Sequence, residues 1–215
     1  MSGDYHGSRL HEDSRRGGVW RALWRYYFSR QVRPDDCVLD MGAGYGDFIN
    51  TVVARRRIAL DIWPAMPGHV APGVETIVGP VQDLSAIEDG NVDFAFASNL
   101  FEHLTQDALV EVLATLRTKL SPRGRLTILQ PNYRYAFREY FDDYTHVTAY
   151  SHVSLPDLLS AHGWDVMEVH PRFLPLSIKS RLPSWPILIA AYLRSPFKPM
   201  GKQMLVVARP RTQQA

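Results

Sequence analysis

Two histidines are the residues of this chain best suited to move a proton. His103 follows a long apolar run, and His146 follows a segment dense in aromatic side chains. Imidazole titrates near neutral pH, so each histidine is a candidate to accept a proton from a hydroxyl group. We take His103 as the first candidate and His146 as the second. The alternative is that either histidine is structural.

The acidic residues just before His146 suggest two further roles. Asp142 and Asp143 either assist His146 as a base or bind a cation. The spacing D-D-x-x-H is not specific for a metal, so we predict no metal site. Asp143 is kept as a candidate catalytic residue.

A glycine-rich loop is the second stretch whose residue types point to chemistry. Residues 38–48 are an apolar strand followed by three glycines at alternate positions, Gly42, Gly44 and Gly46. Glycine reaches backbone angles closed to other residues and lets a ligand lie against the main chain. A strand, a glycine loop and a helix in this order present backbone N–H groups to an adenosine-type ligand. We expect the helix to begin near Asp47 and to bury three apolar residues, Phe48, Val52 and Val53.

The spacing of the glycines and of two acids narrows the choice of ligand. A dinucleotide fingerprint would have its third glycine at position 47, which is Asp. An NAD-dependent oxidoreductase therefore stays only as an alternative. Asp61 ends the next predicted strand, where a carboxylate can accept hydrogen bonds from both ribose hydroxyls. The alternative for Asp61 is a helix cap or a turn residue.

Two motifs resemble those of a known family. The pattern D-x-G-x-G-x-G at residues 40–46 resembles motif I of the class I methyltransferases that use S-adenosylmethionine (SAM). The run S-N-x-x-E-H-L at residues 98–104 resembles motif IV of their small-molecule branch, which is type 11/12-like. The resemblance covers residues 19–209. It implies SAM as cofactor and a Rossmann-like α/β fold, with a doubly wound, mostly parallel seven-stranded sheet whose last strand is antiparallel.

The same resemblance implies roles for eight cofactor-binding residues. These are Asp40, Gly42, Gly44 and Gly46 around the methionine part, Asp61 at the ribose, Asp83 and Leu84 at the adenine, and Asn99 at the cofactor amino group, with the backbone carbonyl of Ser98 as the alternative to that of Asn99. Leu84 is alternatively a core residue. The prolines within residues 63–72 depart from the family pattern and predict a short or irregular second helix.

Periodicity and turn residues predict the elements that position these side chains. We expect helices over residues 19–32, 106–120 and 154–161. We expect strands up to Asp40 and over residues 57–61, 74–78, 91–99, 125–130, 164–173 and 203–209. The helix over 106–120 should be capped by Thr105 and bury Leu109, Val110, Leu113 and Leu116.

The chain is long enough for one domain with a sizeable core. We predict a flexible arm over residues 1–18 and one domain over 19–215, with an insertion at 175–202 between the last two strands. The net charge of +2 and the form of motif IV argue against nucleic acid. The single cysteine, Cys37, and the lack of a signal peptide favour a reducing, cytoplasmic location.

The insertion contains an apolar run at residues 185–193. This run is too short to span a bilayer. It is expected to dock on a second subunit, rest on a membrane surface, cover the substrate or simply pack.

A segment after the fifth predicted strand contains the candidate substrate-binding residues. Aromatic and acidic residues after the fifth strand predict a substrate wall, with Tyr133, Tyr135 and Tyr144 facing the substrate. The alternative is a packed cover without chemistry. Such a wall suits a hydroxyl-bearing small molecule such as a sugar or a natural-product scaffold, so O-methylation comes first and N-methylation second. A SAM-fold protein that binds without methyl transfer is a third interpretation, which the intact glycines disfavour.

Overall fold

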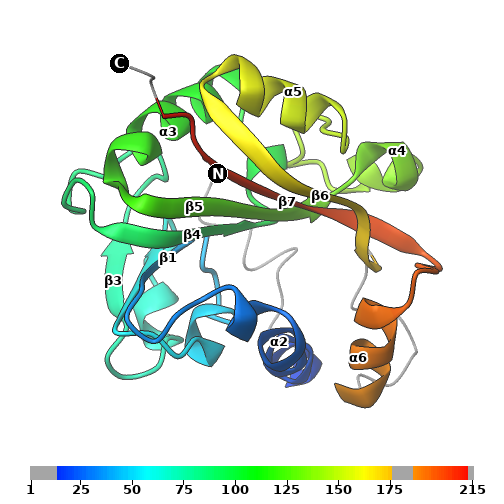
Figure 1. The fold of residues 1–215 in the computed structure, drawn as a ribbon, viewed down its shortest axis with the longest axis horizontal. Helices are drawn as coiled ribbons and strands as arrows, with labels where there is room; N and C mark the ends of the chain where they lie inside the picture. Colours follow the sequence, from blue (N-terminus) through cyan, green and yellow to red (C-terminus); the bar gives the residue numbers. More distant parts are fainter. Residues whose placement is uncertain (1–13, 176–185, 213–215) are drawn as a thin grey trace.

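A seven-stranded sheet forms the centre of the molecule (Figure 1). The structure is a computed structural model that describes residues 14–175 and 186–212. The strands are β1 (Cys37–Met41), β2 (Arg56–Asp61), β3 (Glu75–Val78), β4 (Val92–Ser98), β5 (Leu120–Pro131), β6 (Trp164–Pro175) and β7 (Gly201–Pro210). Their order is β3-β2-β1-β4-β5-β7-β6. Strands β1 to β5 pair in parallel, and β7 runs antiparallel to β5 and β6, which confirms the predicted fold.

Helices cover both faces of the sheet. The α-helices are α2 (Ser14–Tyr26), α3 (Gln106–Lys119), α4 (Tyr133–Ala136), α5 (Ser154–Ala161) and α6 (Pro186–Arg194). Single turns of 3-10 helix are η1 (Phe28–Arg30), η2 (Ile49–Thr51), η3 (Met66–Gly68), η4 (Phe101–His103) and η5 (Tyr140–Asp142). Figure 1 shows α3 and α5 above the sheet and α2 beside α6 below it. Within the described ranges, no helix is both long and apolar enough to cross a membrane.

Successive residues of the apolar strands point alternately into two hydrophobic cores, one on each face of the sheet. On β4, Ala95 and Ala97 belong to the core under α3 and α5, whereas Phe94 and Phe96 belong to the core over α2. A strand buried on both faces reads as a continuous apolar run, as the sequence of β4 does. The same alternation holds for β7, so the sheet is covered over its centre.

The first helix differs from its predicted range. Helix α2 begins at Ser14 and ends at Tyr26, and η1 follows as a separate turn. Residues 14–18 of the predicted arm are therefore helical, and residues 1–13 lie outside the described part of the chain. The ring of Trp20 contacts Phe28, Phe48 and Phe96, which fixes α2 to the sheet.

The helix predicted after the glycine loop is wrong. Only the single turn η2 forms there, and Val53 is 67% exposed. The side chain of Asn50 bonds the backbone of the next loop, at His69 O (2.9 Å) and Ala71 N (2.7 Å). The β-branched residues 51–53 also have low helix propensity, and the chain turns into β2 within a few residues.

Helix α3 begins as predicted. The side chain of Thr105 accepts a hydrogen bond of 3.3 Å from the N–H of Ala108. The buried residues are Leu109, Val112, Leu113 and Leu116. Val110, predicted to be buried, is only partly so, because it lies at the margin of the helix face that these four residues form.

The cap of α3 gives a first stability prediction. Replacement of Thr105 by alanine should lower the free energy of unfolding by about 1 kcal/mol, because an orphan N–H loses its acceptor. Thr115 on the same helix bonds only the carbonyl of Glu111, so Thr115→Ala is the matched control and should cost less. Denaturant unfolding measures both changes. Equal losses in the two variants would contradict a capping role.

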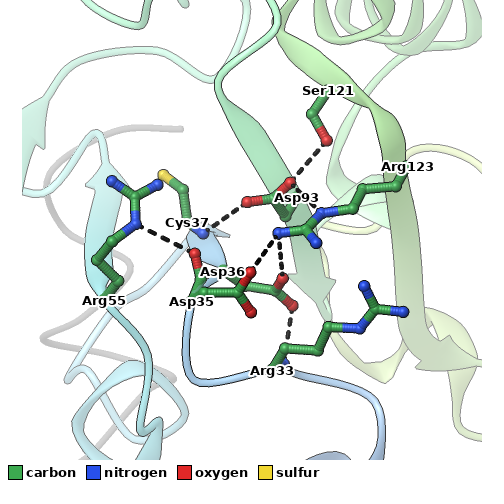
Figure 2. A network of polar contacts seen from close by, with 8 residues as sticks. All are labelled: Arg33, Asp35, Asp36, Cys37, Arg55, Asp93, Ser121 and Arg123. Atoms are coloured by element: carbon green, nitrogen blue, oxygen red, sulfur yellow. Dashed lines mark hydrogen bonds and ion pairs between the residues drawn. The ribbon is translucent and has the colours of Figure 1, made fainter.

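A polar network joins β1, β4 and β5 at the amino end of the sheet (Figure 2). The carboxylate of Asp93 accepts hydrogen bonds from Cys37 N (3.0 Å), Ser121 Oγ (2.7 Å) and Arg123 Nε (3.1 Å). The other end of the Arg123 guanidinium contacts Asp35 at 3.0 Å. These contacts connect the amino ends of the strands, which lie opposite to the glycine loop. The carboxyl ends of the strands remain as the side where ligands bind.

Candidate active site

The glycine loop leaves β1 in a backbone conformation that needs glycine. The φ angles of Gly42, Gly44 and Gly46 are 72°, 52° and 69°. A Cβ on Gly42 would lie 3.0 Å from Leu100 Cδ1, and one on Gly46 would lie 2.9 Å from Asn50 Nδ2. The left-handed region favours glycine, so the loop can pass close to a ligand without side chains in the way.

Asp61 fixes this loop to the neighbouring strand. Its carboxylate is buried and accepts hydrogen bonds from Gly44 N (2.7 Å) and Trp63 N (2.8 Å), one on each oxygen. A carboxylate has about four lone-pair positions, so two remain for a ligand. The carboxyl end of β2 thus presents a rigid acceptor beside the glycine loop, as the sequence predicts.

Asp40 lies on β1 beside Asp61 and is an unusual carboxylate. It is 3% exposed, and burial raises its pKa well above the ordinary value, with the negative charge of Asp61 as the next cause. Two buried acids on adjacent strands create a site that favours a cation.

Helix α2 adds a contact that the sequence analysis missed. Arg16 forms an ion pair of 2.7 Å with Asp47, and both side chains are 18% exposed. Position 47 is therefore occupied by an acid that anchors α2 over the glycine loop. Nothing in the sequence indicates which of the many arginines makes this contact.

The two residues predicted at the adenine behave differently. Leu84 is 1% exposed and belongs to the hydrophobic core, in agreement with its structural alternative. Asp83 is exposed, and one of its oxygens accepts from the N–H and hydroxyl of Ser85. These hydrogen bonds lower the pKa of Asp83, so it stays ionised.

Aromatic rings beside the loop form a cluster that the sequence analysis did not select. Trp63 stacks on His69 with ring centroids 4.9 Å apart, and Tyr45 packs edge-on against both. Tyr45 is part of the glycine loop and Trp63 comes just after Asp61. The position of an aromatic residue two places after the acid could have indicated this cluster.

Asn99, at the carboxyl end of β4, has a strained backbone. Its φ is 49°, which is uncommon for a residue other than glycine. Its N–H donates to Leu129 O (2.8 Å) and its side-chain oxygen accepts from Gln203 Nε2 (2.9 Å). Such strain persists where surrounding contacts hold it and often accompanies ligand binding.

The structure brings together the two histidines predicted as bases. The rings of His103 and His146 lie 4.8 Å apart, although 42 residues separate them in the chain. His103 ends η4, directly after β4, and is 9% exposed; His146 follows η5 and is half-buried. Glu102 lies beside them, and its carboxylate and the two imidazoles all place a ligand atom within 4.8 Å of one another.

Burial determines the protonation of this cluster. The pKa of His103 is lowered to about 4, first by burial and then by His146. Burial also raises the pKa of Glu102 to about 8. His103 is therefore neutral at pH 7, and its low pKa makes it a weak proton acceptor.

Asp143 acts on the cluster through Thr145. One oxygen of Asp143 accepts from the N–H (3.1 Å) and the hydroxyl (2.6 Å) of Thr145. The hydroxyl and carbonyl oxygens of Thr145 lie 3.0 and 3.1 Å from His103 Nδ1. Asp143 thus positions the group that holds His103.

Comparison with known proteins identifies the family. A family model described as a methyltransferase domain matches residues 13–169. The chain belongs to this methyltransferase family. No curated protein sequence matches the chain. The family match overturns the NAD-dependent oxidoreductase that the sequence left as an alternative.

Solved structures show how widely the fold of this methyltransferase is shared. A SAM dependent methyltransferase from Archaeoglobus fulgidus has a TM-score of 0.66 at 20% identity, covering 90% of this chain and 93% of that chain. One from Aquifex aeolicus has a TM-score of 0.63 at 17% identity, covering 97% and 98%. The 1,6-didemethyltoxoflavin-N1-methyltransferase of Burkholderia thailandensis, solved with bound 1,6-didemethyltoxoflavin and S-adenosylhomocysteine, has a TM-score of 0.62 at 21% identity, covering 97% and 84%.

The cofactor of the methyltransferase is SAM, and the residues at the loop fit it. SAM carries a sulfonium and an ammonium group, which suit a site beside the buried acids Asp40 and Asp61. The loop needs glycine at positions 42 and 46, because a Cβ at either position would lie too close to Leu100 or Asn50.

The three tyrosines predicted at the substrate occupy different surroundings. The ring of Tyr135 stacks on His152 and lies under the guanidinium of Arg172, while Tyr144 is 67% exposed. Tyr133 packs against Tyr140, with ring centroids 5.2 Å apart.

Tyr140 is the aromatic residue that the sequence analysis left out. It is 1% exposed, and its ring lies 4.7 Å from that of His146. Its position in a run of aromatic residues gave no sign of which ring would contact the histidines. Of the predicted tyrosines, Tyr133 is connected to the histidine cluster through Tyr140.

Proposed function

We propose that this methyltransferase transfers the methyl group of SAM to a hydroxyl group of a polar small molecule. The observation that carries the proposal is the contact of His103 with His146 at the carboxyl end of β4. In the transfer, the carbon–sulfur bond breaks, the sulfur keeps the electron pair, and a carbon–oxygen bond forms. The hydroxyl proton must leave, so a nearby proton acceptor is useful.

His146 is the better of the two proton acceptors in this proposal. It is less buried than His103, and the pKa of His103 is lowered far below the operating range of a general base. His103 would then hold the ring of His146 in place. This reverses the order of preference that the sequence suggested.

The cofactor contacts proposed here follow the geometry of the loop. Asp40 and the backbone of Gly42, Gly44 and Gly46 would surround the methionine part, and Asp61 would bind the ribose hydroxyls. The left-handed turn at Asn99 would direct backbone carbonyls toward the cofactor amino group. Asp83 would accept from the adenine amino group, with Leu84 supporting the loop from the core.

The surroundings of the histidines favour a polar substrate. Tyr133 and Tyr144 are exposed, and Asp143 and Thr145 present polar atoms on the same segment. A small hydroxylated molecule, such as a sugar or a natural-product scaffold, is the substrate class that such a wall would recognise. The Burkholderia thailandensis structure, which has 1,6-didemethyltoxoflavin bound, supports a small-molecule substrate.

The first experiment titrates the purified chain with SAM, S-adenosylhomocysteine and NAD by calorimetry. We expect binding of the first two and none of NAD. Turnover of labelled SAM is then measured against matched panels of hydroxylated compounds and amines. Methylation of amines alone would contradict O-methylation, and cofactor binding without any turnover would favour a binding protein.

A further inference from the structure

Glu102, His103 and His146 form a compact group of metal-ligand types. One carboxylate oxygen and one nitrogen from each imidazole lie within 4.8 Å of one another. Two ligands that each bond an ion at about 2.1 Å are at most about 4.2 Å apart. Small side-chain movements would therefore let all three share one ion.

Contacts with backbone carbonyls indicate the tautomer of each of the two imidazole rings. His103 Nδ1 lies 3.1 Å from Thr145 O, and His146 Nδ1 lies 2.6 Å from Tyr140 O. A carbonyl oxygen only accepts, so each Nδ1 carries the proton and each Nε2 carries the lone pair. Backbone carbonyls hold metal-binding histidines in this same tautomer and orientation.

Glu102 provides the second, independent observation. Its side chain is 0% exposed, and neither carboxylate oxygen has a hydrogen-bond partner within residues 14–175 and 186–212. Its backbone carbonyl, by contrast, accepts from the N–H groups of Val147 and Thr148, so the segment after His146 is fixed against η4. A buried carboxylate without a donor is costly, and a cation would satisfy it.

We propose that Glu102, His103 and His146 bind one divalent transition-metal ion. Two imidazoles and one carboxylate suit Zn²⁺, Co²⁺ or Mn²⁺, whereas Mg²⁺ and Ca²⁺ prefer all-oxygen sites. Three protein ligands leave at least one coordination position for water or a substrate oxygen. Asp143, which the sequence offered as a cation ligand, instead holds His103 through Thr145.

The inference goes beyond the proposed function and does not depend on it. Metal binding requires only these three side chains, whether or not a methyl group is transferred. With an ion bound, His146 would be a ligand rather than the proton acceptor, and the ion would lower the pKa of a hydroxyl group that it coordinates.

The test titrates chelator-treated full chain with Co²⁺, followed by its visible absorption, and with Zn²⁺, followed by calorimetry. Neither SAM nor substrate is added, so the outcome is separate from that of the proposed function. We expect one ion per chain and a rise in the unfolding temperature with Zn²⁺. Glu102→Gln should weaken metal binding at least about 10–100-fold. A loss of this size is already seen when a residue that only hydrogen-bonds to a metal ligand is replaced.

His170→Gln is the matched control. His170 pairs with Glu168 on β6 at 3.2 Å, an exposed histidine–carboxylate pair away from the cluster, and its loss should leave binding unchanged. His146→Gln is the second test variant in case Glu102→Gln does not fold. The absence of a cobalt spectrum in the folded parent chain, or equal affinity in the parent and a folded cluster variant, would overturn the proposal.

Discussion

Replacement of Asp61 by asparagine is expected to weaken binding of S-adenosylhomocysteine by about 10²–10⁴-fold. Each hydrogen bond to a charged group contributes about 1.5–3 kcal/mol, and the proposed ribose contact uses two. The change also disturbs the loop, because an amide nitrogen would face either Gly44 N or Trp63 N, and both are donors. Calorimetric titration measures the loss directly.

Asp89→Asn is the control for this prediction. Asp89 is an exposed acid paired with Lys119 at 2.7 Å, on a loop that makes no proposed cofactor contact. The substitution Asp89→Asn removes the same charge as Asp61→Asn. It should change cofactor affinity less than about threefold, since surface ion pairs contribute little. If Asp61→Asn behaves like this control while remaining folded, Asp61 does not bind the cofactor.

Local sequence patterns were sufficient to predict most of the sheet. Apolar runs predicted strands such as β4 and β7, and the cap at Thr105 located the start of α3. The exception is the segment after the glycine loop. There the side chain of Asn50 bonds the backbone of a distant loop, and this tertiary contact replaces the helix that the motif predicts.

The candidate site was predicted less completely, because its key contacts join distant parts of the chain. The glycine loop and Asp61 could be selected from spacing alone. The contact of His103 with His146 depends on how residues after β5 return to η4, which no local pattern specifies. Glu102 was visible as a motif residue, but its burial without a partner appears only in the folded structure.

The contacts of Arg16 and Tyr140 also could not be predicted from local sequence. An arginine on a helix and a tyrosine in an aromatic run are common, and their sequence neighbours do not distinguish them. Packing gives them their places, one against Asp47 and the other against His146.

Replacement of Asp40 by asparagine is expected to stabilise the cofactor-free protein at pH 8 by roughly 1–3 kcal/mol, the usual desolvation penalty of a buried polar group. Burial raises the pKa of Asp40 above its value in the unfolded chain, so the folded state holds the proton more tightly. The contribution of Asp40 to the free energy of unfolding is therefore fully present below about pH 4, and it is lost as the pH rises through the raised pKa. Asparagine does not ionise, so the variant does not lose this stability at high pH. At pH 4 Asp40 is protonated, and the variant and parent should differ little.

Denaturant unfolding between pH 4 and 9 measures this difference, with Asp157→Asn as the control. Asp157 is an exposed acid in the first turn of α5, and its loss should change stability by less than about 1 kcal/mol. An Asp40→Asn protein that is less stable than the parent at pH 8 would contradict the prediction.

The gain in stability should come with a loss of function. A cationic cofactor beside Asp40 favours the ionised carboxylate, so Asp40→Asn should weaken binding of SAM, which has a sulfonium, more than binding of S-adenosylhomocysteine, which does not. Equal weakening of both ligands would place Asp40 away from the sulfonium. A buried acid that destabilises the empty protein and binds a cation is the trade between stability and activity expected at a ligand site.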